Sequence, residues 1–375
     1  MISYFTPKRG GDVNVCYNIS KCLARRGHEV TIITTDFEFD SSYARSIEKD
    51  GVKVFAFNCV ANYGPFLVTP SMGCWLKENI HTFDVVHTHN FRSYQNNLVR
   101  YYAKKCNVDY ILQAHGSVLP IFQRQRLKQL YDLAWGTRIL RDATKVIALT
   151  QEEENQYVKM GVSEEKIKRV PNGINLNEYE DLPERGTFRK KYRIENADKL
   201  ILYLGRLHKI KGIDLLIDSF SDIEKKYSDV KLVIVGPDEG YLPTLKNQIR
   251  TLGIGHKILF TGPVYGYDKI SAFVDADVYV LPSVYETFPI SVLESWACGL
   301  PVIVTDRCGI ADIIDDRGGL VVPYDKDRLS EAILRVLSDN SMRNRLGKQG
   351  RLQVEEQFNW ENIALYIEKI LCNVK

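Results

Sequence analysis

The sequence predicts an α/β fold with two doubly wound parallel sheets. Short runs rich in Val, Ile and Leu alternate with helical patterns along the 375 residues, and they fall into two series. Such runs are typical of strands that are buried on both faces of a parallel sheet. Because the chain is also long for one domain, we expect each series to form a domain of its own.

The first series ends before residue 151, and a helical pattern over 12–26 lies near its start. It contains the predicted strands HEVTIITT (28–35), FDVVHTH (83–89), DYILQAH (109–115) and TKVIALT (144–150). The stretch VPNGINLNEYEDLPERG (170–186) is rich in turn residues and follows this series. We therefore expect a first domain over residues 1–172.

The second series has helical patterns over 212–227 and 324–338, and we expect its domain over residues 173–356. Its predicted strands are KLILYLG (199–205), VKLVIVG (230–236), KILFTG (257–262), ADVYVLP (276–282) and PVIVTD (301–306). Ligands of doubly wound sheets bind outside the carboxyl ends of the strands, so a crevice there is the expected site.

Composition excludes several classes of protein. A net charge of +3 is too small to indicate a nucleic-acid partner, although basic residues outnumber acidic ones over residues 1–170. The eight cysteines are scattered without a C-x-x-C pair, which favours a reducing, cytoplasmic setting. No signal peptide and no run of 18 apolar residues is present, and no G-x-G-x-x-G supports a dinucleotide oxidoreductase.

Two glutamates lie in an otherwise apolar stretch after the strand at 276–282. Glu286 falls in the loop at the carboxyl end of that strand. A helix is expected from Ile290 to about Cys298, because Gly299 suits the left-handed position that ends a helix. Glu294 then lies one turn into the helix, and both carboxylates can face the same crevice.

The start of this helix suits a phosphate, because its first backbone N–H groups have no partner within the helix. An extended ligand reconciles this with two carboxylates. Glu294 would accept hydrogen bonds from the hydroxyls of a ribose, the helix start would hold a diphosphate, and Glu286 would reach a sugar beyond it. The alternative is a solvated loop acid and an acid that complements the helix dipole.

Two cations follow the first strand of the second series. Arg206 and Lys211 lie in the loop after KLILYLG, and together they suit a diphosphate, the arginine as a fork and the lysine as a point charge. They would neutralise the charge of a departing nucleoside diphosphate without a metal ion. The alternative is a pair of ordinary surface cations.

The stretch LPSVYETFPISVLESWACGLPVIVTD (281–306) resembles the signature of glycosyltransferase family 4, which are retaining glycosyltransferases of the GT-B fold. The resemblance implies two Rossmann-like domains facing a central cleft, the first binding the acceptor and the second the nucleotide sugar. It also implies that the last helix, expected within 357–375, rejoins the first domain. Pro289 departs from the family, where glycine is commoner.

The resemblance implies roles for individual residues. Glu286 and His115 would be catalytic, with Glu286 beside the donor sugar. The implied donor-binding residues are Arg206, Lys211, Glu294, Gly10, Gly11, Phe288, Pro289, Ile290 and Gly236. Gly10 and Gly11 are expected between a first strand and the first helix, where a plain turn is the alternative.

Polar residues at strand ends of the first domain are expected on the acceptor side, namely His87, His89 and Asn172. A metal site is not expected at the two histidines, because no third ligand is apparent. Asp275 and Asp277 form a D-A-D sequence, but they precede a strand and so lie at the wrong edge for a site. We expect them to cap or turn the chain.

The segment PIFQRQRLKQLYDLAWGTRILR (120–141) interleaves cations with apolar side chains. It offers a surface for an anionic membrane, and the alternative is a helix pair whose cations extend along apolar neighbours.

The sequence thus predicts a metal-independent hexosyltransferase without a cofactor. It would move a sugar from a UDP- or GDP-linked donor to a glycan or lipid-linked acceptor, in the cytoplasm or on the cytoplasmic membrane face. The resemblance alone implies that the anomeric configuration is retained. The alternatives are a nucleotide-sugar 2-epimerase and a non-catalytic nucleotide-sugar-binding protein.

Overall fold

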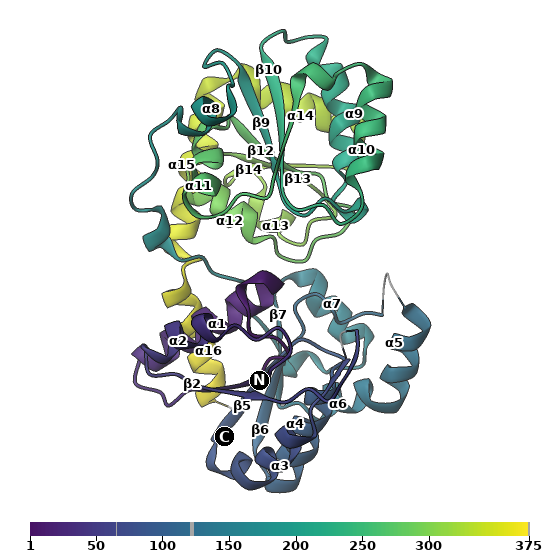
Figure 1. The fold of residues 1–375 in the computed structure, drawn as a ribbon, viewed down its shortest axis with the longest axis vertical. Helices are drawn as coiled ribbons and strands as arrows, with labels where there is room; N and C mark the ends of the chain where they lie inside the picture. The colour runs from purple at the N-terminus through teal and green to yellow at the C-terminus, as the bar shows by residue number, and fades with distance from the viewer. Residues whose placement is uncertain (65, 121–123, 374–375) are drawn as a thin grey trace. The chain divides into compact units, whose positions relative to one another are not determined.

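The computed structural model describes residues 1–64, 66–120 and 124–373, and the chain divides into two compact units (Figure 1). Unit 1 comprises Met1–Asn172 and Trp360–Lys375, and unit 2 comprises Gly173–Asn359. The last helix of the chain therefore belongs with its first half. Within the described ranges, no helix combines the length and the apolar character needed to cross a membrane.

Unit 1 is built on parallel strands, as its apolar runs predict. The strands form a pair, β1-β2, and a four-stranded sheet in the order β5-β6-β7-β8, while β3 and β4 form a small antiparallel hairpin. The bounds are β1 Thr31–Thr35, β2 Lys53–Phe57, β3 Ala61–Tyr63, β4 Phe66–Val68, β5 Val85–His89, β6 Asp109–Gln113, β7 Lys145–Ala148 and β8 Ile167–Arg169.

Helices cover both faces of the sheet of unit 1. One hydrophobic cluster joins α1 and α16 to β6 and β7, and a second joins α3, α4 and α6 to the other face. The helices are η1 Pro7–Arg9, α1 Gly11–Arg25, α2 Ser41–Glu48, α3 Pro70–Asn79, η2 Ile80–Thr82, α4 Tyr94–Cys106, α5 Gln125–Tyr131, the π-helix η3 Asp132–Gly136, α6 Thr137–Asp142, α7 Gln151–Lys159, η4 Glu164–Lys166 and α16 Trp360–Cys372.

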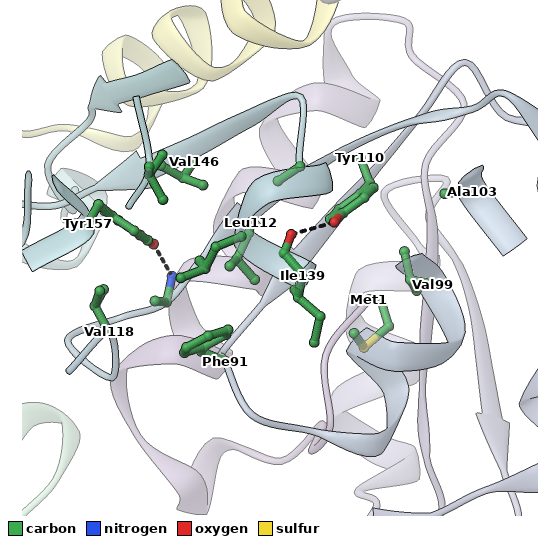
Figure 2. Close-up of a cluster of buried hydrophobic side chains, with 14 of the residues drawn as sticks. Met1, Phe91, Val99, Ala103, Tyr110, Leu112, Val118, Ile139, Val146 and Tyr157 are labelled. Atoms are coloured by element: carbon green, nitrogen blue, oxygen red, sulfur yellow. Dashed lines mark hydrogen bonds between the residues drawn. The ribbon is translucent and has the colours of Figure 1, made fainter. Parts of the chain in front are cut away.

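The second of these clusters is closed by hydrogen bonds as well as by packing. Figure 2 shows the hydroxyl of Tyr110 donating to the carbonyl of Ile139, and the hydroxyl of Tyr157 accepting from the backbone N–H of Ala114 at 3.1 Å. A buried phenol needs such a partner, because an unpaired hydroxyl in an apolar interior is costly. The bond to Ala114 anchors the backbone directly after β6, one residue before His115.

The prediction of a regular strand before Gly10 is wrong. Met1 to Ser3 form hydrogen bonds to β1 and β5, but the segment is too short to join the two sheets, and the helical turn η1 follows it. A buried parallel strand requires neighbours along several residues, and here only three are in place.

Unit 2 contains one six-stranded parallel sheet in the order β11-β10-β9-β12-β13-β14. The chain first adds strands on one side of β9 and then returns to add strands on the other side. The loops after β9 and β12 therefore diverge at a topological switch point, where doubly wound proteins bind ligands. The strands are β9 Lys199–Leu204, β10 Val230–Val235, β11 Ile258–Gly262, β12 Val278–Leu281, β13 Val302–Thr305 and β14 Gly319–Val322.

Two layers of helices enclose this sheet (Figure 1). α9 packs with α10 and α14, whereas α12 packs with α15 and α11 packs with α8. The bounds are η5 Leu176–Tyr179, α8 Thr187–Tyr192, η6 Lys209–Lys211, α9 Ile213–Glu224, α10 Leu242–Leu252, η7 Gly255–Lys257, α11 Gly266–Asp275, α12 Ile290–Ala297, α13 Ala311–Ile314, α14 Lys326–Ser338 and α15 Asn340–Glu356.

Candidate functional site

The switch point of unit 2 brings together two residues that the sequence singles out. Lys211 ends the short helix η6 after β9, and its ammonium contacts the carboxylate of Glu286 in the loop after β12. The two side chains are only 15% and 17% exposed. A cation and an acid are thus held together, largely removed from water, at the strand edge where a ligand is expected.

Backbone contacts fix both loops. The N–H of Val284 donates to the carbonyl of Ile210 at 2.8 Å, and the N–H of Gly309 donates to the carbonyl of Glu286 at 2.7 Å. Gly212 has a φ of +64°, and a Cβ there would lie 1.9 Å from the carbonyl oxygen of Pro282. Only glycine allows this close approach, so the backbone next to Lys211 packs directly against the end of β12 and fixes where Lys211 lies.

Arg206 lies on the other side of β9 and has a different acidic partner. Its Nη1 donates to both carboxylate oxygens of Glu239, at 2.8 and 2.9 Å, in the loop after β10. The Arg206 side chain is 58% exposed, so this ion pair is weak and readily exchanged for another anion. Gly236 directly follows β10, and a Cβ there would lie 1.8 Å from the carbonyl oxygen of Gly205.

The helix α12 begins at Ile290 and ends before Gly299 in its left-handed conformation, as predicted. Pro289 precedes the first turn. The side chain of Phe288 is buried and packs near Phe358, with 6.2 Å between ring centroids, so it offers a ligand only its backbone. At this end of the helix, the hydroxyls of Ser291 and Tyr279 are 2.7 Å apart, and Tyr279 also donates to the carbonyl of Leu204 at 3.1 Å. These bonds tie the start of α12 to the end of β9.

Glu294 has two partners that sequence reasoning missed. The ammonium of Lys269 in α11 lies 2.6 Å from its Oε1, and both side chains are mostly buried. Burial alone would lower the pKa of Lys269, but the Glu294 carboxylate outweighs it and the pKa stays above its ordinary value. Burial also raises the pKa of Tyr179, whose hydroxyl bonds Glu294. The carboxylate is therefore held by a cation and a phenol.

The D-A-D sequence has the structural role that we expected. Asp275 accepts from the backbone N–H groups of Gly186 and Arg189, and Asp277 accepts from that of Leu200 at 2.8 Å. Both carboxylates are buried and engaged in the packing of α8 against β9. In the described part of the chain, no group of three or more His, Cys, Asp and Glu side chains is placed to hold a metal ion.

In unit 1 the three predicted histidines form a stack. The rings of His87 and His89 have centroids 4.3 Å apart, and Nδ1 of His89 lies 3.0 Å from Nε2 of His115. Burial lowers the pKa of His87 to about 3 and that of His115 to about 4. The imidazoles are therefore neutral at pH 7, which suits hydrogen bonding to a hydroxyl rather than pairing with an anion.

Glu153, which the sequence did not reveal, holds the turn after His115. Its buried carboxylate accepts from the N–H groups of Gly116 at 2.6 Å and Leu149 at 2.7 Å. Burial raises the pKa of Glu153 to about 7. An acid three residues into a helix after a Thr is a usual capping pattern, so the sequence carried no sign of this longer contact.

Gly10 and Gly11 lie at the start of α1, where Gly10 has a φ of +99° that favours glycine. Asp12 follows in the first turn, and its carboxylate accepts from the side-chain amide of Asn90 at 2.8 Å. Asn172 is buried at the end of this part of unit 1, and among the described residues its Oδ1 has no hydrogen-bond partner.

From Gln125 onward, the segment at 120–141 forms one continuous helical run rather than a helix pair. α5 passes through the π-helical turn η3 into α6, and residues 121–123 lie outside the described residues. Asp132 starts the π turn and pairs with Arg92, both largely buried. Four apolar side chains of the run are exposed, Leu127 at 63%, Leu130 at 63%, Leu133 at 79% and Trp135 at 51%.

Comparisons with known families and proteins find glycosyltransferases along the whole chain. The model of Glycosyltransferase Family 4 matches residues 9–178, and that of Glycosyl transferases group 1 matches residues 184–353. The uncharacterized glycosyltransferase MJ1607 of Methanocaldococcus jannaschii is 29% identical, over 97% of this chain and 95% of its own length. The phosphatidyl-myo-inositol mannosyltransferase of Mycobacterium leprae is 29% identical, over 54% of this chain and 52% of its own.

Among solved structures, HepE of Anabaena in complex with UDP has a TM-score of 0.80 at 19% identity. The superposition covers 99% of this chain and 98% of HepE. The same protein in complex with UDP-glucose gives a TM-score of 0.78. At this identity the likeness shows a shared fold over the whole chain.

Proposed function

Because the chain belongs to glycosyltransferase family 4 and has the GT-B fold of two Rossmann-like domains, we propose that it transfers a sugar from a UDP- or GDP-linked donor. The observation that carries this proposal is the contact of Lys211 with Glu286 at the switch point of unit 2. A cation that can meet a diphosphate and an acid that can meet a sugar lie there side by side.

Each donor group has a partner in unit 2. Lys211, Arg206 and the backbone N–H of Ile290 bind the diphosphate, and Gly236 lines the nucleotide. Pro289 has no N–H to donate, so it only positions the start of the helix beside the diphosphate. Glu294 accepts hydrogen bonds from the ribose, oriented by Lys269. That HepE was solved with UDP and with UDP-glucose supports a donor of this class.

Glu286 serves the sugar in this proposal. When the diphosphate takes over Lys211, the carboxylate is released from its ion pair and can accept from sugar hydroxyls and stabilise positive charge on the ring. The diphosphate leaves with its new negative charge facing Lys211 and Arg206. These cations supply the neutralisation that a metal ion supplies in other transferases, so we propose metal-independent transfer. We propose retention of the anomeric configuration from the resemblance to the family alone.

Unit 1 binds the acceptor in this proposal. His87, His89 and Asn172 line its side, and His115 offers a neutral imidazole to a sugar hydroxyl, while Gly10 and Gly11 leave room for a close backbone approach. The acceptor is a glycan or a lipid-linked glycan. The relative from Mycobacterium leprae, which by its name acts on phosphatidyl-myo-inositol, supports a lipid-linked acceptor.

We further propose that the run α5-η3-α6 rests on an anionic membrane on the cytoplasmic side. Its exposed leucines and Trp135 suit the apolar boundary of a bilayer. Exposed arginines on the same run, among them Arg126 and Arg138, suit anionic headgroups. A lipid-linked acceptor would then be presented at the surface where the enzyme sits.

One assay tests the reaction. The protein is incubated with a panel of UDP- and GDP-linked hexoses, with and without candidate acceptors and with EDTA or Mg²⁺, and the products are followed by NMR. We expect transfer from one donor, an unchanged anomeric configuration and no loss with EDTA. Release of nucleotide with an epimerised sugar would indicate an epimerase, and tight donor binding without turnover would indicate a binding protein.

A further inference from the structure

Arg92 joins three segments at the carboxyl edge of the sheet of unit 1. It lies in the loop after β5, and its guanidinium donates to both carboxylate oxygens of Asp132, at 2.8 and 2.7 Å. The same guanidinium donates to the backbone carbonyls of Ser117 and Val118, in the loop after β6. Both side chains of the ion pair are only 9% exposed. One buried arginine thus connects its own loop, the loop that carries His115 and the helical run that contains Asp132.

Two residues of these loops have backbone conformations that need such support. Arg92 has a φ of +50° and His115 a φ of +52°, in the left-handed region that is uncommon for residues other than glycine and asparagine. Residues in this region persist where their surroundings hold them, and they cluster at functional sites. Glu153 binds the N–H of Gly116, and Arg92 binds the next two carbonyls. The chain directly after His115 is therefore held at three successive residues.

The π-turn η3 sets the position of the acid that holds Arg92. Asp132 begins this turn, and a Cβ on Gly136, four residues later, would collide with its carboxylate. On another side of the guanidinium, Cζ of Arg92 lies 4.5 Å from the centroid of the Phe91 ring. Single π-turns within helices are frequent at functional sites. The arginine is thus fixed by an acid, an aromatic ring and two carbonyls.

The imidazole of His115 depends on this loop for its direction. Its Nε2 lies 3.0 Å from Nδ1 of His89 and is engaged there, so the other ring nitrogen is the one that can meet a sugar hydroxyl. A change of φ at His115 would swing the whole side chain. Because a displacement of about 1 Å can cost about 100-fold in rate, the loop after β6 must be rigid for the imidazole to serve.

We propose that Arg92 is a positioning residue: anchored by Asp132, it holds the loop after β6, and through this loop it orients the imidazole of His115 toward the acceptor. The role in transfer rests on the proposed function, whereas the orientation of His115 can be measured without a reaction. The alternative is that Arg92 and Asp132 only pack the helical run against the sheet. Loss of the contacts would then lower stability and leave His115 unchanged.

The test replaces Arg92 with lysine in the full chain. An ammonium can still pair with Asp132, but it lacks the planar fork that reaches a carboxylate and two carbonyls at once. The matched control is Arg189→Lys in unit 2. Arg189 is also buried, and it likewise pairs with an acid and donates to backbone carbonyls. Both variants therefore lose a buried fork, but only one of them lies beside His115.

NMR of protein labelled with 15N-histidine gives the first readout. In Arg92→Lys we expect the ring nitrogen signals of His89 and His115 to shift by several ppm, because the hydrogen bond between the two rings is displaced. Arg189→Lys should give the wild-type signals for both rings. The ring of His256 in unit 2 serves as an internal reference, since neither histidine of the pair contacts that unit's sheet.

Steady-state kinetics gives the second readout. Arg92→Lys should lower kcat/KM for the acceptor by about tenfold or more, because the imidazole is misplaced. The KM for the donor should stay within about twofold of the wild type, since the proposed diphosphate and ribose contacts lie in unit 2. Arg189→Lys should change neither constant.

Unchanged histidine signals in Arg92→Lys would overturn the proposal, whatever the activity. Shifted signals with wild-type kinetics for both substrates would overturn the role in transfer. If the wild type transfers no sugar from any donor, the proposed function fails, and the histidine signals still decide whether Arg92 orients His115. Should Arg92→Lys not fold, Asp132→Asn takes its place, because it loosens the same contacts from the other end and gives the same two readouts.

Discussion

The ammonium of Lys211 contacts the carboxylate of Glu286, although 75 residues separate them in the chain. Each residue is set by its own loop at the carboxyl edge of the sheet, and the switch in strand order brings the loops together. In the proposed reaction this pair is the state without donor. If a diphosphate replaces Glu286 as the partner of Lys211, donor binding is coupled to release of the acid.

Replacing Lys211 with alanine should weaken UDP binding by about 10- to 100-fold, the effect of losing one charge-assisted hydrogen bond of about 1.5–3 kcal/mol. Calorimetry with UDP measures this directly. Lys209→Ala is the matched control, since Lys209 lies in the same short helix but is exposed. Equal UDP affinity of wild type and Lys211→Ala would remove Lys211 from the donor site.

Glu286→Gln should affect UDP binding and sugar transfer in opposite ways. Without the carboxylate, the charge of Lys211 is uncompensated, so UDP should bind as tightly as in the wild type or more tightly. Transfer should fall by about 100-fold or more, because the charge that stabilises the transition state is lost. Calorimetry and a turnover assay on the same preparation separate these effects. Wild-type turnover, or a large loss of UDP affinity, would contradict the role of Glu286.

Lys269→Met should weaken UDP binding by about tenfold while leaving the affinity for inorganic pyrophosphate unchanged. The reason is that Lys269 orients Glu294, which we assign to the ribose, and pyrophosphate has no ribose. Lys191→Met is a matched control. It removes an exposed ion pair with Asp268, which lies on α11, the helix that also carries Lys269. Parallel losses for UDP and pyrophosphate would indicate general damage and exclude the orienting role.

Much of this site follows from local sequence patterns. The apolar runs predict every strand of unit 2 except β14, Gly319–Val322, which begins with the second glycine of a Gly-Gly pair and so looks like the continuation of a turn. Gly299 predicts the end of α12, and the loop position of Glu286 follows from the end of β12. These features depend on residues that are close in the chain.

Ion pairs between side chains from different loops and helices could not be predicted from the sequence in the same way. Lys269 meets Glu294, and Arg206 meets Glu239, only because of the strand order and of side-chain directions that no local pattern encodes. The first strand was wrongly predicted for a related reason. Met1 to Phe5 has the composition of a strand, but only three residues lie between β1 and β5. Local preference did not decide the outcome, because pairing along the whole strand was lacking.

The stacked histidines should make stability depend on pH. The pKa of His87 is lowered to about 3 and that of His115 to about 4 in the folded state, mainly by burial, against 6.5 for an ordinary histidine. The unfolded chain therefore binds more protons between pH 6.5 and 4, and the free energy of unfolding should fall as pH decreases through this window. Glu153 acts in the opposite direction, because its pKa is raised to about 7 in the folded state. Between pH 7 and 4.5 the folded chain therefore binds more protons at this group than the unfolded chain does. This contribution to the free energy of unfolding rises as pH falls through that range.

A difference between variants isolates the histidine contribution. The free energy of unfolding of the wild type minus that of His115→Gln should be constant above pH 7 and should decline from pH 6.5 to 4. Glu153, the Met1 amino group and Asp12, which also act on this region, are present in both proteins and largely cancel. Urea unfolding at several pH values gives the measurement. A difference independent of pH would mean that His115 titrates normally in the folded state.

The helical run α5-η3-α6 should bind anionic vesicles through charge and apolar contact together. Arg126→Glu with Arg138→Glu should weaken binding to vesicles with anionic lipid by about 30-fold or more, at about 1 kcal/mol for each lost cation. Added salt should reduce the wild-type affinity in the same way, because it screens surface charges. Leu130→Ser with Leu133→Ser should also weaken binding, but without changing the salt dependence. These changes remove no charge and only reduce the apolar area that the run would bury in the bilayer. Leu352→Ser, an exposed leucine of unit 2, is the control and should bind as the wild type does. Unaltered vesicle binding in both double variants would place any membrane contact elsewhere, and the exposed leucines would then require another explanation.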